Sequence, residues 1–531
     1  MAKTRKVQVG HVTVEVPHTL FDRAIERFSP ERGAARLHSR VVTAMASGGY
    51  AGASRTDNTF ADWNPRATDA DSALIRDLTT LRARSRALVR DSAVAGGATN
   101  TTVSNVVGTG LALMPRIDAG FLGLDEASAA DWQATTLREF NLWAESKDCS
   151  ANRRLNFYEL QSLAFRSVLE NGDALVTTPL RPSPRQPYKL AIQLTEADRV
   201  SNPNGKPDTD ALVAGVELDA FGEHVAFHVC DRHPGNYRVL GGKAAWTRIE
   251  SWGAGGLRRN AWLLAEPLRI GQTRGVPFLA PIIGPLKQLE RYTYAELMAA
   301  VVSGMFTVFI KSEGDGIADL GNDGAGSAGE DWDGSLRNGK AVMLNPGDSI
   351  ETANPGRPNA QFDPFVTAIL TQVGMQLQIP REVLIKSFTS SYSAARAAML
   401  DAWRFFKGRR AWLVENFTQL IYELWLAEAV AAGRIAAPGF FADPAVRRAW
   451  CAAEWVGDGP GSLDPVKEVS AARERVDMGI STLAAESLLH DGVDWETKHR
   501  QRARETAMRR EAGMDSAAVP RPVDEDEGAD Q

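Results

Sequence analysis

A polar loop that leads directly into a very long helical pattern dominates residues 380–432. The loop, Phe388 to Ser393, combines five hydroxyl-bearing residues with one phenylalanine. After it, small and apolar residues recur at the three- and four-residue spacing of a helix with one buried face. These positions are Ala395, Met399, Ala402, Phe406, Ala411, Val414, Phe417, Ile421 and Leu424. The pairing predicts a long lever that carries a mobile loop at its start.

Composition places the chain among ordinary globular proteins with several domains. Its 531 residues, 44% hydrophobic and 24% charged, are enough to bury large cores. The formal net charge of -6 excludes a general basic excess, so any contact with DNA must come from local charge or from geometry. Residues 312–363 hold ten acidic and three basic residues, whereas residues 381–415 hold seven basic and three acidic ones. The middle of the chain therefore contains an acidic segment followed by a basic one.

Cysteine usage and apolar runs indicate a reducing compartment and no membrane span. Cys149, Cys230 and Cys451 lie far apart without CxxC spacing, so neither a disulfide framework nor a thiolate zinc site is expected. The N-terminus lacks the apolar core of a signal peptide. The uncharged run from Leu297 to Ile310 is 14 residues long, below the roughly 20 needed to cross a bilayer. We expect it to be a buried helix.

Helical periodicity and β-type alternation predict a predominantly helical α+β protein. Residues 174–229 hold short alternating runs separated by Pro, Asn, Asp and Gly, which is typical of β-strands. Weak periodicity over residues 1–70 predicts a partly disordered N-terminal arm, and the acidic tail from Asp515 predicts disorder. Helices are expected near residues 71–96, 127–145, 157–171, 286–311, 365–378, 394–432 and 464–514, with a short strand at 340–344.

A cluster of histidines raises an enzymatic alternative, a metal-dependent nuclease or hydrolase. Imidazole and thiolate are zinc ligands, and five candidate residues lie within ten positions. They are His224, His228, Cys230, Asp231 and His233. Their spacing matches no established zinc pattern, and no further carboxylate or histidine partners are evident. Structural or surface roles are therefore favoured, and neither a metal nor a cofactor is expected.

Other motif-like features are better explained by ordinary structure. Gly324, Gly326 and Gly329 spell GxGxxG, but no strand precedes them and nearby acids would repel a pyrophosphate. The chain has no Walker A motif, so it would need a separate ATPase for any energy-driven step. Helical spacing places Arg82, Arg86 and Arg90 on one helix face. An exposed face is favoured there over a surface that contacts DNA or another subunit.

Several stretches together resemble the lambda-type portal proteins of tailed phages, the head-to-tail connectors. Tyr392-Ser393-Ala394-Ala395-Arg396 fits the YSxxR signature of that family. Further matches follow in the same order over roughly residues 75–513. They are RARSRALVRDS (82–92), VVGTGL (106–111), NGDALV (171–176), GVELDAFGEHVAFHV (215–229), RGVPFLAP (274–281), RYTYAELMAA (291–300) and DPVKEVSAARERVDMGIST with DGVDWE after it.

The resemblance implies a ring of identical subunits, typically twelve, at the unique capsid vertex. Such a ring surrounds a channel for DNA entry and exit, and its subunit is not an enzyme. The family description of wing, stem, clip and crown implies a division of the chain as follows. The segments are the arm 1–70, wing 71–280, stem helix 281–311, clip 312–360, stem helix 361–379, channel loop 380–393, long wing helix 394–449, crown 450–514 and acidic tail 515–531.

By the same resemblance, two sets of residues become candidate sites. Those expected to face the channel near the DNA are Lys386, Phe388, Thr389, Ser390, Ser391 and Tyr392. Those expected to meet the terminase large subunit and a head-tail adaptor are Asp315, Asp319, Asp323, Glu330, Asp331 and Asp333. Capsid and scaffold proteins are further expected partners. The chain is expected in the host cytoplasm during assembly and afterwards in the virion, at the portal vertex of the capsid. The alternative for the first set is an ordinary polar connector between two helices. The alternative for the acidic set is a solvated, flexible insertion.

Physical arguments agree with this assignment. Two helices that flank an irregular insert form a hairpin whose apolar faces must be buried against each other and against neighbouring subunits. A duplex that must slide cannot be held by many Lys and Arg, because phosphate neutralisation gives tight non-specific binding. Hydroxyls and few charges suit a sliding contact. A non-portal head-tail adaptor is weakened as an alternative by the chain length and the long hairpin.

Overall fold

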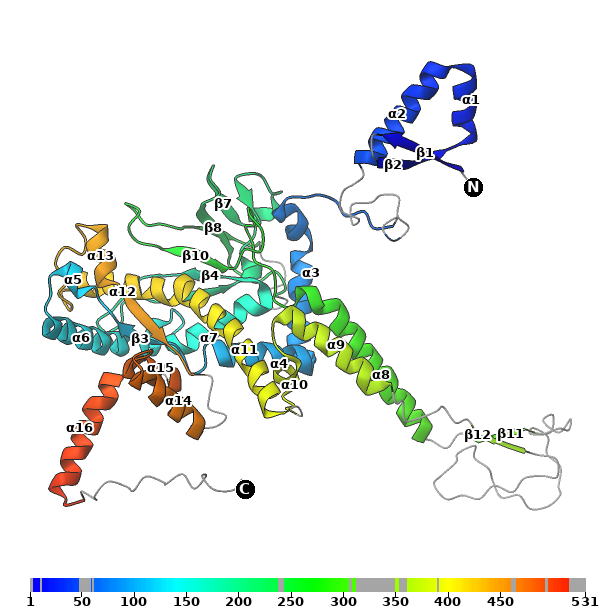
Figure 1. Cartoon of the computed structure of the whole chain (residues 1–531). Helices are drawn as coiled ribbons and strands as arrows, with labels where there is room; N and C mark the ends of the chain where they lie inside the picture. Colours follow the sequence, from blue (N-terminus) through cyan, green and yellow to red (C-terminus); the bar gives the residue numbers. More distant parts are fainter. Residues whose placement is uncertain are drawn as a thin grey trace, which may run out of the picture. The chain divides into compact units, whose positions relative to one another are not determined.

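The computed structural model describes most of the chain and divides it into two compact units, Met1–Asp69 and Ala70–Gln531 (Figure 1). Helices dominate, with several small antiparallel sheets, which confirms the predicted α+β class. The described residues are 3–9, 12–46, 59, 62–236, 243–304, 308–311, 349–352, 361–388, 391–459, 465–491 and 495–514.

The first unit is a β-hairpin followed by two helices, where the sequence predicted a partly disordered arm. The strands pair antiparallel from Lys3 opposite His18 to Val9 opposite Val12. Thr19 and Asp22 form a reciprocal capping box that starts the first helix. Asp22 also accepts a hydrogen bond from Arg40. The elements are β1 (Lys3–Val9), β2 (Val12–His18), α1 (Leu20–Phe28) and α2 (Pro30–Ala46). Local capping thus organises a segment whose periodicity is weak.

The second unit begins with helices whose boundaries follow capping signals. The predicted end near Gly96 is wrong, because Ser92 breaks the helix earlier and caps the next one. A Cβ at Gly96 would lie 2.7 Å from the Val89 carbonyl oxygen, so this glycine allows a close approach between helices. The predicted helix that stops at Gly172 is confirmed, with φ +88° there. These helices are α3 (Ala70–Asp91), α4 (Ala93–Val106), α5 (Ala119–Leu122), α6 (Glu126–Ala144) and α7 (Phe157–Asn171).

The predicted β-rich region forms two antiparallel sheets, ordered β10-β4-β5 and β6-β7-β8-β9. All residues of the central strand β4 are buried, which explains why Ala, Leu and Val fill its three middle positions without alternation. A separate pair, β3 (Ala112–Pro115) with β13 (Ala453–Val456), joins distant parts of the chain. The sheet strands are β4 (Asp173–Thr177), β5 (Gln193–Glu196), β6 (Leu212–Val213), β7 (Val216–Leu218), β8 (His224–Cys230), β9 (Trp246–Glu250) and β10 (Ala261–Ala265).

The predicted lever is confirmed as α11 (Tyr392–Leu413), a π-helical turn (Val414–Thr418) and α12 (Gln419–Ala431). Its buried face joins an aromatic core, where the rings of Phe140 and Trp425 lie 5.1 Å apart. Ala411 is exposed, contrary to the prediction, and Leu413 is buried in its place. Leu413 is seven residues after the buried Phe406 and therefore lies on the same face.

The remaining elements include a helical pair on either side of the acidic segment. The predicted helix through residue 311 is wrong at its end, because residues 308–311 form a strand that pairs with residues 349–352. Among the described residues, no helix is both long enough and apolar enough to cross a bilayer. These elements are α8 (Ile283–Gly304), β11 (Val308–Lys311), β12 (Ser349–Thr352), α9 (Phe362–Leu377), α10 (Arg381–Ile385), α13 (Pro444–Trp450), α14 (Pro465–Asp477), α15 (Leu483–Asp491) and α16 (Trp495–Glu511).

Candidate functional site

Helices α8 and α9 form a hairpin that is only partly covered by the rest of the chain (Figure 1). At its base, Leu286 and Leu289 are buried. Further along, Tyr292 stacks on Phe362 with ring centroids 5.6 Å apart and meets Phe365 edge-on at 4.8 Å. The two helices therefore hold each other through aromatic contacts on their facing sides.

The outer side of α8 carries an apolar stripe without a partner among the described residues. Tyr294, Leu297, Met298 and Val301 have the spacing of one helix face, and their exposed fractions are 64%, 60%, 42% and 45%. The sequence predicted a buried helix from Leu297 onward. That prediction is wrong for the single chain, in which Leu297, Met298 and Val301 are exposed. We call these four residues the α8 stripe.

A short connection links the hairpin to the lever. Gln378 caps the C-terminal end of α9, and Lys386 caps that of α10. Both residues adopt left-handed backbone conformations, with φ values of 56° and 54°. Non-glycine residues occupy this region at a conformational cost. The amide of Ser387 donates to the Glu382 carbonyl at 3.1 Å and closes the turn. The chain is thus redirected twice within nine residues, and the second change of direction lies inside the predicted channel loop, 380–393.

The structure places part of the predicted channel loop. Lys386 is exposed, and Phe388 is half exposed beside a pocket of about 240 Å³ that Met399 and Trp403 also line. Ser391 caps α11 by accepting a hydrogen bond from the Ala394 amide at 3.4 Å. The backbone of Tyr392 begins that helix, whereas Thr389 and Ser390 lie outside the described residues. The start of the loop is therefore anchored on α11.

The acidic candidates cannot be placed in the same way. Asp315, Asp319, Asp323, Glu330, Asp331 and Asp333 lie outside the described residues, as do the glycines of the GxGxxG sequence and the predicted strand at 340–344. The antiparallel pair β11 and β12 joins the two sides of this segment. The assignment of these acids to partner binding stays a prediction.

The predicted histidine cluster is divided among separate contacts. His224 packs edge-on against Phe227, and burial lowers its pKa. Nε2 of His228 lies 2.7 Å from Glu217. The Arg248 guanidinium and, to a smaller degree, His228 lower the pKa of that carboxyl. These contacts do not direct the imidazoles at one point.

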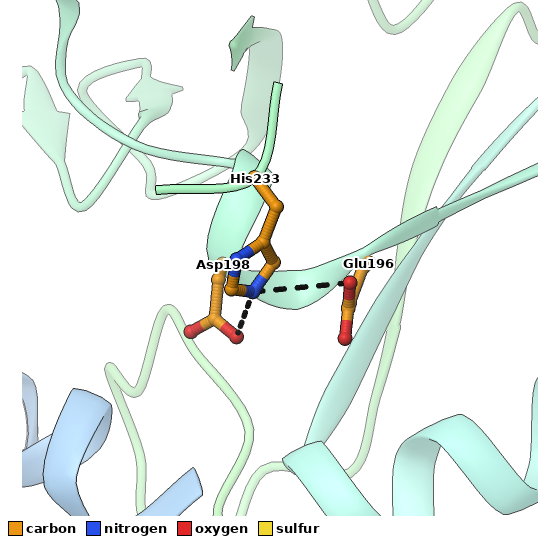
Figure 2. Close-up of side chains that lie close together, drawn as sticks. All are labelled: Glu196, Asp198 and His233. Atoms are coloured by element: carbon orange, nitrogen blue, oxygen red, sulfur yellow. Dashed lines mark hydrogen bonds and ion pairs between the residues drawn. The ribbon is translucent and has the colours of Figure 1, made fainter. Parts of the chain in front are cut away.

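A different group of ligand-type side chains does converge, as Figure 2 shows. Nε2 of His233 lies 3.2 Å from Asp198 Oδ2 and 3.8 Å from Glu196 Oε2. The guanidinium of Arg86 binds the same Asp198 carboxylate, and Arg82 Nη1 lies 3.8 Å from it. A divalent cation would be repelled by these two guanidinium groups. The arrangement is an ion-pair cluster that satisfies its own charges.

Next to this cluster is a fully buried charge centre at Asp173. Arg274 forms a two-point contact with its carboxylate at 2.8 and 2.9 Å, and Arg82 donates to it at 2.9 Å. The Gly275 amide donates at 2.9 Å. Burial would raise the pKa of Asp173, but the two arginines outweigh it and lower that pKa. We call Asp173, Arg82 and Arg274 the Asp173 centre.

The Asp173 centre corrects the prediction of an exposed arginine face on α3. Arg82 is only 4% exposed, and burial lowers its pKa to about 10 despite the attraction of Asp173. Arg86 is half buried and binds Asn171 and Asp198. Arg90 is exposed and pairs with the neighbouring Asp91. Helical spacing placed the three residues on one side, but it could not reveal the acid that covers that side.

Sequence comparison assigns the chain to a family. A profile described as phage portal protein, lambda family, matches residues 56–410, about two thirds of the chain. The chain belongs to the lambda family of phage portal proteins. This confirms the predicted resemblance.

The portal chain has curated relatives that match over most of their lengths. The portal protein of Escherichia phage N15 is 27% identical over 478 residues, which cover 86% of this chain and 89% of the relative. Portal protein B of Escherichia phage lambda is 26% identical over 491 residues, covering 88% and 91%. A chain in the virion of a native gene transfer agent particle gives a TM-score of 0.41 at 12% identity, covering 82% of this chain and 93% of that one. The assignment rests on the sequence match, and it identifies a structural protein of phage virions.

Three of the stretches that carry the family resemblance meet in the portal chain at the Asp173 centre. Residues 82–92 supply Arg82, residues 171–176 supply Asp173, and residues 274–281 supply Arg274. Arg274 also donates to the backbone carbonyls of Ala197, Val200 and Ala214. One guanidinium thus connects both sheets to the segment that leads into α8.

Proposed function

We propose that the chain assembles into a ring of identical subunits, twelve in number, at the unique capsid vertex. The ring surrounds a channel through which double-stranded DNA enters and leaves without sequence recognition. Membership of the portal family supports this function. The observation that carries the ring is the α8 stripe, because exposed apolar side chains at helical spacing require a partner surface.

The stripe supplies a direct test of the ring. Changing Leu297 and Val301 to Glu places two charges where a neighbouring subunit is expected, and burying an unpaired charge costs several kcal/mol. The variant is expected to remain folded but to lose large assemblies in light scattering and negative-stain images. Ala300→Glu is the matched control, since Ala300 is exposed on another side of α8. Rings that form equally well in both variants would exclude the stripe as an interface.

We assign the channel surface to Lys386, Phe388, Thr389, Ser390, Ser391 and Tyr392. The position of Lys386 between the hairpin and the lever supports this assignment, as does the scarcity of charge in the loop, because few cations permit sliding. Replacing residues 388–393 by Gly and Ser at equal length is expected to leave assembly intact and to reduce the length of packaged DNA. Full-length packaging would contradict the assignment.

The acidic segment is proposed as the docking site for the terminase large subunit and a head-tail adaptor. Ten acids among residues 312–363 support a charge-directed interaction with basic partner surfaces. Changing its six candidate acids to Asn or Gln should weaken capture of both partners and leave the ring unchanged. The chain would act as a passive conduit, with energy from a separate ATPase and with capsid and scaffold proteins around it. It would assemble in the host cytoplasm.

In this proposal the chain divides as the resemblance implies. Helices α8 and α9 form the stem, residues 312–360 the clip, residues 71–280 and α11 with α12 the wing, and residues 450–514 the crown. The order of helices along the chain supports the division.

A further inference from the structure

Helix α16 separates its charges by face. At about 100° per residue, all of its cations but Arg500 and Arg504 fall within roughly a third of the helix circumference. Its three acids, Glu496, Glu505 and Glu511, lie outside that sector. The sector, which we call the cationic face, consists of Trp495, Lys498, His499, Arg502, Thr506, Arg509 and Arg510. Its formal charge is +4 with His499 neutral.

The described residues leave most of this face exposed, whereas Trp495 and Lys498 at its start are half-buried. Every residue from His499 to Met514 is exposed. Arg502 and Arg509 form no ion pair with any described residue. A helix of 17 residues that is polar all round gains little from packing, and such helices are marginal on their own. A ligand of opposite charge would stabilise α16 and neutralise clustered cations that repel one another.

An acidic segment of suitable charge and length follows directly. Residues 515–531 begin four positions after Glu511 and contain six acids and one arginine, a formal charge of -5. Four of the acids are consecutive, from Asp524 to Glu527. The nine residues before Asp524 can extend about 30 Å, whereas α16 is about 25 Å long. The acidic run can therefore reach any part of the cationic face.

We propose that residues 515–531 fold back onto the cationic face of the same chain and screen it from other polyanions. Exposed ion pairs are individually weak and sensitive to salt, but a short tether gives the second partner a high effective concentration. The inference depends on charge and reach within this chain and is independent of the proposed channel. It predicts a contact that is lost at high ionic strength.

The first test uses a chain that ends at Met514 and a fluorescent peptide of residues 515–531. The truncated chain should bind the peptide at low salt, with at least tenfold weaker binding when Arg502 and Arg509 are both changed to Gln. The matched control is Arg500→Gln with Arg504→Gln, which removes the same charge from the other side of α16. It should bind within about twofold of the truncated parent, and circular dichroism should show equal helix content in all chains.

The second test compares the truncated and full-length chains. The full-length chain should bind the peptide at least tenfold more weakly, because its own tail occupies the face. Duplex DNA at low salt should bind more tightly to the truncated chain, through Arg502 and Arg509. The proposal would be overturned if both double arginine variants lost peptide affinity equally. It would also be overturned if the truncated and full-length chains bound the peptide with equal affinity. A truncated chain that binds DNA but not peptide would also overturn it and assign the face to nucleic acid.

Discussion

The Asp173 centre buries a charged side chain, whereas the α8 stripe exposes apolar ones. Each arrangement is unfavourable unless a partner group covers or neutralises the side chain. Asp173 is fully buried, and two guanidinium groups and a backbone amide of the same chain satisfy it. The α8 stripe leaves four large side chains 42% to 64% exposed. The centre is complete within one chain, whereas the stripe is proposed to need a neighbouring subunit. If the proposed ring forms, stability and assembly depend on different residues, which mutation can separate.

Removing the buried acid should produce the largest effect on the isolated chain. Asp173→Ala leaves Arg82 and Arg274 buried without their counter-ion, at an expected cost of about 3–5 kcal/mol. Urea unfolding of the second unit should show this loss, independent of protein concentration. Arg90→Ala, which removes an exposed pair on the same helix, should change stability by less than about 0.5 kcal/mol. A small cost for Asp173→Ala would show that the centre contributes little.

Thiol labelling can test the stripe without a charge change. The three native cysteines are buried, and burial raises the pKa of Cys149 and of Cys451 to about 12, so these thiols should stay unreactive in the folded chain. In Leu297→Cys, the new thiol should react readily in the monomer and at least tenfold more slowly in the assembly. Ala300→Cys serves as the control on another side of the helix. Equal protection of both positions would indicate general crowding.

Local signals predicted much of the fold, and long-range pairing explains most of what was missed. The end of α7 follows from Gly172, and the lever follows from apolar spacing, because both depend on neighbouring residues. The Asp173 centre joins residues 91 and 101 positions apart, which no periodicity reveals. For the same reason, the His233 partners Glu196 and Asp198 were missed.

The candidate site was predictable to the extent that it depends on chain order. Pro380 and the hydroxyl-rich sequence correctly located a connection before α11, and its hydroxyl residues include the cap Ser391. The sequence could not show that α10 ends in a left-handed residue, because a lysine at position 386 gives no signal for positive φ. It also could not distinguish an apolar stripe that faces its own core from one that faces solvent. Both have the same helical spacing, and the difference depends on which elements pack against α8.

A partly exposed ion pair should give a smaller, pH-dependent effect than the Asp173 centre. Glu139 accepts two bonds from Arg434 at 2.8 Å and one from Tyr188 at 2.7 Å, and Arg434 is the main cause of its lowered pKa. A lowered folded-state pKa adds stability above the unfolded value, and that stability is lost as pH falls through the folded value. Glu139→Gln should therefore cost about 1 kcal/mol at pH 7. The difference from the parent should begin to shrink as pH falls below the unfolded value of about 4.3 and should disappear below the lower folded-state pKa. A difference that stays constant would contradict the ionic origin.

The smallest expected effect separates backbone strain from function at the boundary between hairpin and loop. Glycine at position 386 or 378 should relieve left-handed strain of about 1–2 kcal/mol, partly offset by its greater freedom in the unfolded chain. Each variant should thus gain up to about 1 kcal/mol in urea unfolding. Only Lys386→Gly removes a cation proposed to face the DNA, so only it should alter packaged DNA length. The two changes relieve the same kind of backbone strain on either side of α10. Equal packaging by both variants would therefore show that the charge of Lys386 does not affect DNA packaging.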